Sequence, residues 1–161
     1  IRRPGRDAGA GDGNFSQGES VMESDEHRAR LLQVLAKDRR FPVEAYLFIE
    51  EVVSRATQEL RSKGETGIAK HISGQELLMI AKKLLLQKYG PLAIDVLESW
   101  NVTRSDDFGE LVFNLADVGL LGTSPNDAKS DFAAVFDFTA AFVEPFVARG
   151  PKPQLPLLDV N

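Results

Sequence analysis

The stretch SGQELLMIAKKLLLQKYGP, residues 73–91, decides the fold that this sequence predicts. Ser73 and Glu76 have the spacing of a capping box, in which each side chain accepts a hydrogen bond from the other residue's backbone N–H at a helix start. The apolar residues that follow recur at helical spacing and form one wide face: Leu77, Ile80, Ala81, Leu84 and Leu85. Gly90-Pro91 ends the pattern, so we expect a central helix between them.

Further helices are predicted on both sides of this one, beginning near residues 23, 42, 91, 107, 125 and 137. In the second, Tyr46, Ile49, Val53, Ala56 and Leu60 follow a helical stripe. Ser124-Pro125-x-Asp127 and Asp137 are start signals for the last two. No alternating strand pattern of useful length is present. The sequence therefore predicts an all-α fold, a single compact bundle of about seven helices.

The chain ends differ in composition from its centre. Residues 1–21 are rich in glycine and charge, which predicts a disordered tail or a non-native extension with a start at Met22. Residues 148–161 carry three prolines and predict an extended tail. The helical domain is therefore expected at residues 22–147.

Composition excludes several classes of function. The 161 residues are 43% hydrophobic and 27% charged, with no cysteine and two histidines. The absence of cysteine excludes a disulfide framework, a cysteine-ligated metal and a thiol nucleophile. We find no phosphate-binding loop, dinucleotide fingerprint or nucleophile motif, and Asp107-Phe108-Gly109 stands without the other kinase motifs. We therefore expect no catalytic residue, cofactor or resident metal.

Charge and hydropathy bear on the partners. The net charge is −5, and residues 105–161 alone carry nine acidic and three basic groups. That acidity disfavours nucleic acid, a polyanion. Residues 92–122 nevertheless have helix-turn-helix spacing, which keeps nucleic-acid binding as the alternative function. Neither a membrane span nor a secretory signal is evident, so we expect a cytoplasmic protein that does not enter membranes.

Three segments carry a resemblance to a known family: HISGQELL (71–78), QKYGPLAIDVLESWNV (87–102) and RSDDFGELVFNLADVGLLG (104–122). With the later pairs Asp131-Phe132 and Asp137-Phe138, they resemble an uncharacterised bacterial family labelled by the Minf locus prefix. The resemblance covers residues 41–146. It implies a compact, single-domain bacterial protein and no assigned activity.

Two groups of residues are candidates for a site. His71, Asp107, Glu110 and Asn114 form a possible polar cluster, since the last three share one helix face and His71 could fold against them. A divalent cation is one interpretation; an acidic helix start with a locally bonded amide is the other. Asn114 interrupts an apolar run, and a buried amide must find partners.

The second group is aromatic. Phe138, Phe142 and Phe146 are spaced four residues apart, in the part of the chain that holds seven of the ten phenylalanines. They are either core residues or an exposed ridge that docks a partner or a second copy. The leading interpretation of the whole sequence is a non-enzymatic protein-interaction or structural module, with an unknown protein or a second copy as its partner.

Overall fold

The structure is a computed structural model that describes residues 1–4, 17–63 and 71–147. Within these ranges there are five α-helices: α1 (Gln17–Lys37), α2 (Val43–Ser62), α3 (Gly74–Tyr89), α4 (Ala93–Ser99) and α5 (Ser105–Asp117). Short 3₁₀ turns form η1 (Gly90–Leu92), η2 (Lys129–Phe132) and η4 (Glu144–Phe146), and η3 (Thr139–Val143) is a π-helical turn. The prediction of an all-α fold is confirmed.

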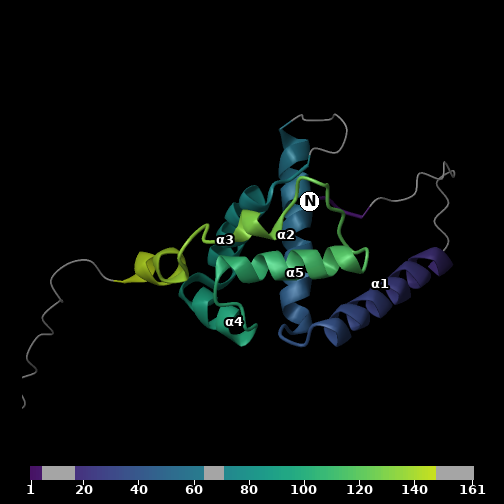
Figure 1. The fold of residues 1–161 in the computed structure, drawn as a ribbon, viewed down its shortest axis with the longest axis horizontal. Coiled ribbons are helices and arrows are strands. Elements are labelled where there is room, and N and C mark those ends of the chain that lie inside the picture. Colours follow the sequence, from purple (N-terminus) through teal and green to yellow (C-terminus); the bar gives the residue numbers. More distant parts are fainter. Residues whose placement is uncertain (5–16, 64–70, 148–161) are drawn as a thin grey trace, which may run out of the picture.

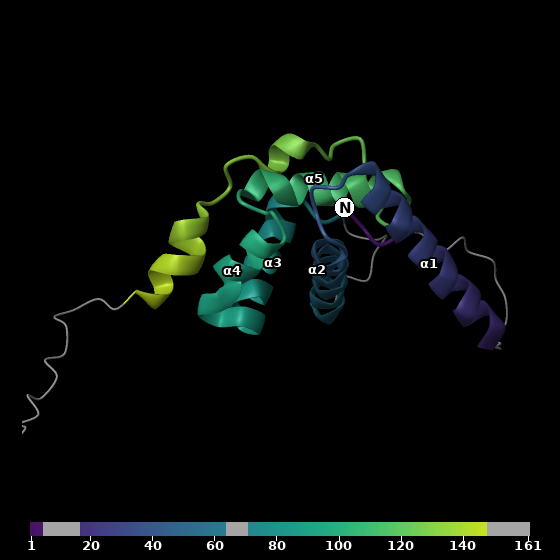
Figure 2. The same cartoon turned by 90° about the horizontal axis from the view of Figure 1, so that it is seen from below.

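α5 occupies the centre of the arrangement. It contacts α1, α2, α3 and η2, and it crosses α2 in Figure 1. Its apolar face is fully buried, with Phe108, Leu111, Val112 and Leu115 at 1% exposure or less. α2 buries the predicted stripe from Tyr46 to Ala56, and α3 buries Leu77, Ala81, Leu84 and Leu85. Figure 2 shows α1 and the η3–η4 segment on opposite sides of these helices.

The ends of α3 follow the sequence signals. Ser73 Oγ accepts from the Glu76 N–H at 3.1 Å, and Glu76 Oε2 accepts from the Ser73 N–H at 2.9 Å, so the capping box is confirmed. Gly90 ends the helix at a φ of 52°, a left-handed conformation that glycine adopts at little cost. The chain then turns through η1 into α4.

The prediction of about seven helices is wrong for residues 125–146. This segment forms 3₁₀ and π-helical turns. From η2 to Val135 it lies along α5, where Ser105 Oγ donates to the Phe132 carbonyl at 2.7 Å and accepts from the Val135 N–H at 3.1 Å. Because Ser105 of α5 supplies hydrogen-bond partners to the backbone of this segment, these backbone groups do not need the partners that a continuous helix would provide.

The N-terminal segment also differs from the prediction. α1 begins at Gln17 and not near residue 23. Among its described side chains, Leu31 and Val34 are buried, one turn apart, and Leu35 packs partly buried against the core, whereas Leu32 points outward at 60% exposure. Ile1 is fully buried, so the prediction of a disordered tail over residues 1–21 is wrong at that position. Residues 5–16 and the Pro-rich segment predicted at 148–161 lie outside the described residues.

Candidate functional site

The four residues of the predicted polar cluster lie in three separate places. Asp107 Oδ2 accepts from the backbone N–H groups of Thr103 and Arg104, at 2.9 and 3.2 Å, and so fixes the start of α5. His71 precedes α3 and contacts Asp127. Only Glu110 and Asn114 join one network, described next. The folded chain therefore does not bring the four together.

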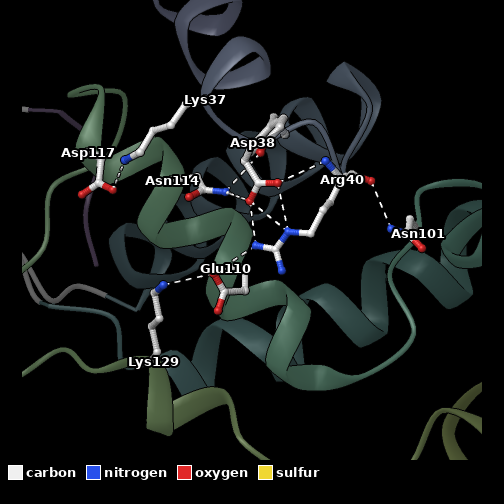
Figure 3. A network of polar contacts seen from close by, with 9 residues as sticks. Lys37, Asp38, Arg40, Asn101, Glu110, Asn114, Asp117 and Lys129 are labelled. Atoms are coloured by element: carbon white, nitrogen blue, oxygen red, sulfur yellow. Dashed lines mark hydrogen bonds and ion pairs between the residues drawn. The ribbon is translucent and has the colours of Figure 1, made fainter.

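Asn114 lies in α5 and is 7% exposed. Its Nδ2 donates to Asp38 Oδ2 at 2.9 Å (Figure 3). The same Nδ2 lies 3.2 Å from the Tyr46 hydroxyl. The expectation that this amide needs partners inside the fold is confirmed. Its bonds connect α5 to the α1–α2 turn and to α2.

Arg40 completes the same network from that turn. Its Nε donates to Asp38 Oδ1 at 2.9 Å and its Nη2 to Asp38 Oδ2 at 2.7 Å, a bidentate pair. Nη2 also lies 3.3 Å from Glu110 Oε2, which Lys129 Nζ approaches at 3.0 Å (Figure 3). We call Asp38, Arg40, Tyr46, Glu110, Asn114 and Lys129 the Asp38 network.

The electrostatics of this network follow from its bonds. The Arg40 guanidinium holds the pKa of the Asp38 carboxyl far below its ordinary range, with a further contribution from Asn114. The same pair raises the pKa of Arg40. Burial raises the pKa of the Tyr46 hydroxyl. These shifts favour an ionised Asp38 and a neutral Tyr46 at neutral pH, which suits a fixed structural contact more than proton transfer.

Metal ligation finds no support in the part of the chain that the structure describes. No group of three or more His, Asp or Glu side chains is arranged there to hold an ion. Asp38 and Glu110 instead face the cations Arg40 and Lys129. The acidic side chains of α5 thus accept hydrogen bonds from backbone N–H groups or form ion pairs.

His71 meets a serine and an aspartate that the sequence analysis did not associate with it. Its Nε2 lies 2.6 Å from Asp127 Oδ1 and 3.3 Å from Ser124 Oγ. A relay between serine and aspartate needs them on opposite ring nitrogens, so that one holds the tautomer while the other is deprotonated. Both contacts here involve the same nitrogen. The geometry therefore does not make His71 a general base for Ser124.

The three phenylalanines do not form one exposed row. Phe138 and Phe142 are buried at 7% and 0% exposure, and their ring centroids lie 5.4 Å apart. Phe136 packs against both. Only Phe146 is exposed, at 47%, because η3 and η4 do not continue the helical spacing on which the ridge depended. The interpretation of Phe138 and Phe142 as a docking ridge is therefore wrong.

Asp38, Arg40 and Asp127 are structural centres that the sequence analysis did not identify. Asp38 and Arg40 follow a helix end, and Asp127 stands in a helix start signal, so each had an adequate local explanation. Asn114 could have pointed to a partner such as Asp38, because a buried amide needs a hydrogen-bond partner. The sequence does not indicate which residue that partner is. The partners lie 76 and 68 residues away in sequence.

A shallow groove lies between α1 and the end of α5. Arg30, Gln33, Lys37, Asp117 and the Val118–Gly119 turn line it. Lys37 Nζ pairs with Asp117 Oδ2 at 2.5 Å, and Arg30 Nη1 donates to the Gly119 carbonyl at 3.1 Å. These bonds across the groove hold α1 against α5.

In the described ranges no helix combines the length and the hydropathy that crossing a membrane requires. Comparison of the chain with protein-family models, with curated proteins and with solved structures finds no match in any of the three.

Proposed function

We propose that this chain is a non-catalytic protein-interaction module that docks a partner through an apolar surface at the end formed by η1 and η4. The surface consists of Leu92, Phe146 and Val147, which are 62%, 47% and 59% exposed. η1 contacts η3, and η4 follows η3 directly in the chain, so both turns lie next to η3. We call these three residues the C-terminal apolar surface.

The exposure of Phe146 is the observation that carries the proposal. Phe138 and Phe142, in the same segment, are buried with Phe136 in a ring cluster. That cluster gives the segment a packed base, while Phe146 and Val147 remain exposed beyond it. Large apolar side chains grouped on a surface mark binding sites, and aromatic residues contribute most to interface energy.

The polar chemistry of the domain supports a binding role over a catalytic one. The titratable groups with shifted pKa values, such as Asp38 and Asp127, are tied to internal partners. A catalytic group needs to face bound substrate in a pocket. The groove between α1 and α5 is shallow, and ion pairs and backbone bonds cross it.

Nucleic-acid binding remains the second candidate, with less support. Basic residues of α3 pair with acids of α2: Lys88 with Glu51 at 2.7 Å and Lys83 with Glu59 at 4.0 Å. α5, the second helix of the predicted helix-turn-helix, packs against α1, α2, α3 and η2. A recognition helix needs an open, basic face to enter a groove.

The experiment compares Phe146→Asp with Leu47→Asp in the full chain. Leu47 is 44% exposed on α2, so it is matched to Phe146 in exposure but lies on another element. Both variants should lose less than about 1 kcal/mol of stability, as surface changes usually do. Each chain serves as bait in chemical cross-linking with quantitative mass spectrometry, and sedimentation velocity measures self-association.

We expect Phe146→Asp to lose a set of cross-linked proteins, or a self-associated species, that wild type and Leu47→Asp retain. Identical cross-linked sets and sedimentation for all three chains would overturn the proposal. A loss shared equally by both variants would also overturn it, since the C-terminal apolar surface would then have no special part. Salt-sensitive binding of duplex DNA by all three would favour the second candidate.

A further inference from the structure

The C-terminal apolar surface lies among acidic side chains. Asp95 follows Leu92 by three residues, the spacing of neighbours on a helix surface, and Glu144 begins η4, which also holds Phe146. Both carboxylates are exposed. α4 and η1 contact η3, and Figure 2 shows the η3–η4 segment on the same side of α5 as α3 and α4. Exposed apolar and acidic side chains therefore share one end of the molecule.

No basic residue occurs in the two stretches that form this end. Residues 89–103 and 133–147 contain no lysine, arginine or histidine and four acids: Asp95, Glu98, Asp137 and Glu144. All four acids are exposed, and none forms an ion pair with a residue that the structure describes. The two stretches thus carry negative charge that their own side chains do not balance.

The basic side chains that adjoin this end are engaged inside the fold. Lys88, the last basic residue of α3, pairs with Glu51 of α2 at 2.7 Å. Lys82 Nζ lies 5.9 Å from the centre of the Phe136 ring, a cation–π contact. The acids of α4 and η4 therefore retain their attraction for a cation that arrives from outside the fold.

We propose that the C-terminal apolar surface binds a basic amphipathic helix of a protein partner, an inference that rests on the proposed function and names the chemistry of its partner. The apolar face of the helix covers Leu92, Phe146 and Val147, and its basic side chains face Asp95 and Glu144. Lysine and arginine suit this boundary, because their methylene stems pack on apolar surface while their charged ends reach the acids.

Other classes of partner match this surface less well. An extended peptide binds by adding a strand to a sheet edge, whereas the described residues contain only an isolated bridge between Arg2 and Gly122. Nucleic acids and anionic lipids carry phosphates, which the exposed acids repel. A basic amphipathic helix matches both the apolar and the acidic part of the surface.

The test measures the binding of two synthetic helical peptides to the full chain by isothermal titration calorimetry. One peptide has leucine on one face and lysine on the other, and the second has glutamate in place of every lysine. We expect the lysine peptide to bind at least about tenfold more tightly than the glutamate peptide, because only its charges complement the surface. Equal affinities, or no binding of the lysine peptide, would overturn the proposal.

Matched variants locate the charge contribution. Asp95→Asn/Glu144→Gln removes two charges from the surface, and Asp25→Asn/Glu44→Gln removes two from exposed positions on α1 and α2. Each pair includes an acid in the first turn of an α-helix, Asp95 or Glu44. We expect the first pair to weaken binding of the lysine peptide about threefold to tenfold and the second to leave it unchanged. Equal weakening by both pairs would mean attraction by net charge alone and would overturn the proposal.

Phe146→Ser and Leu47→Ser test the apolar contribution in the same titration. We expect Phe146→Ser to weaken binding of the lysine peptide at least about fivefold and Leu47→Ser to have no effect, because only Phe146 lies in the surface. Unchanged binding by Phe146→Ser would overturn the proposal. Failure of the docking role itself is measured separately, since the cross-linking comparison of Phe146→Asp with Leu47→Asp uses no peptide. A difference there, without a preference for the lysine peptide, would reject the basic helix alone.

The chain itself supplies one competing occupant. Arg149 and Lys152 follow this surface in the sequence, outside the residues that the structure describes. In Arg149→Gln/Lys152→Gln we expect the affinity for the lysine peptide to stay within about twofold of wild type. A larger gain in affinity would show that the following segment of the same chain competes for the surface, and it would overturn the assignment to a separate partner.

Discussion

Phe132 is the residue on which α3 and α5 converge. It is 1% exposed, and its ring lies against the backbone of both helices. A Cβ atom added at Gly74 would lie 2.9 Å from Phe132 Cε2, and one added at Gly109 would lie 3.0 Å from Phe132 Cδ2. Both distances are shorter than ordinary carbon contacts. The glycine of the Asp107-Phe108-Gly109 tripeptide thus has a packing role that the sequence alone did not reveal.

Gly74→Ala is expected to destabilise the domain by about 1–3 kcal/mol, the usual cost of overpacking a filled core. The added methyl group has no free space, because Asp131 Cβ also lies 3.0 Å from its position. Chemical denaturation measures the effect. Phe132→Leu, destabilising alone, should reduce the cost of Gly74→Ala when the two are combined, and Gln75→Ala is the exposed neighbouring control. Simple additivity of the two changes would contradict this account.

For a single element, local sequence signals determine where a turn begins, but they do not determine how far a helix continues. α3 begins and ends where Ser73, Glu76 and Gly90 predict, because caps act on backbone groups within one turn. The segment near residue 137 has a comparable signal: Asp137 Oδ1 accepts from the Ala140 N–H at 2.9 Å. A π-helical turn follows there and Pro145 lies in η4, so a cap starts a turn but does not ensure its continuation.

Ser73→Ala is expected to lower the free energy of unfolding by about 1 kcal/mol, the usual contribution of an N-cap. The change leaves the Glu76 N–H without its side-chain acceptor at the exposed start of α3. Urea denaturation measures it, with Ser73→Asp as the control, since aspartate also caps helices well. A stability of Ser73→Ala equal to wild type would show that water replaces the cap at no cost.

Across the whole molecule, the Asp38 network joins parts of the chain that are distant in sequence. Asp38 lies after α1, Tyr46 in α2 and Asn114 in α5, and Lys129 reaches the network from η2. Asn101 adds the turn before α5, by donating to the Arg40 carbonyl at 3.2 Å. A change at Asp38 should therefore affect global unfolding and not a single helix.

Asp38→Asn is expected to destabilise the domain by about 1.5–3 kcal/mol at pH 7, through loss of hydrogen bonds to a charged group. The folded pKa of Asp38 lies below its ordinary value of 3.8, so folding favours the ionised form. This stabilisation is present above pH 3.8 and is lost as the pH falls from there towards the folded pKa.

Denaturation at a series of pH values between neutrality and pH 3 tests this expectation. The difference in the free energy of unfolding between wild type and Asp38→Asn should become smaller as the solution becomes acidic. Asp117→Asn, at a carboxylate with 56% side-chain exposure, should show a much smaller gap at neutral pH. If the difference in the free energy of unfolding between wild type and Asp38→Asn stays constant with pH, the carboxylate charge contributes nothing to folding.

The sequence by itself determined the helical class, the stripe of α2, the start and end of α3 and the need of Asn114 for a partner, because periodicity and caps act within a few residues. Only the tertiary structure decided that Asn114 meets Asp38, that His71 meets Asp127 and not α5, and that Ile1 is buried. Residues 125–146 are a further example. Local signals predict helices there, but the segment forms short turns, of which η2 contacts α3 and α5. These outcomes depend on which distant surfaces meet, and the pairs Asn114–Asp38 and His71–Asp127 are separated by 76 and 56 residues.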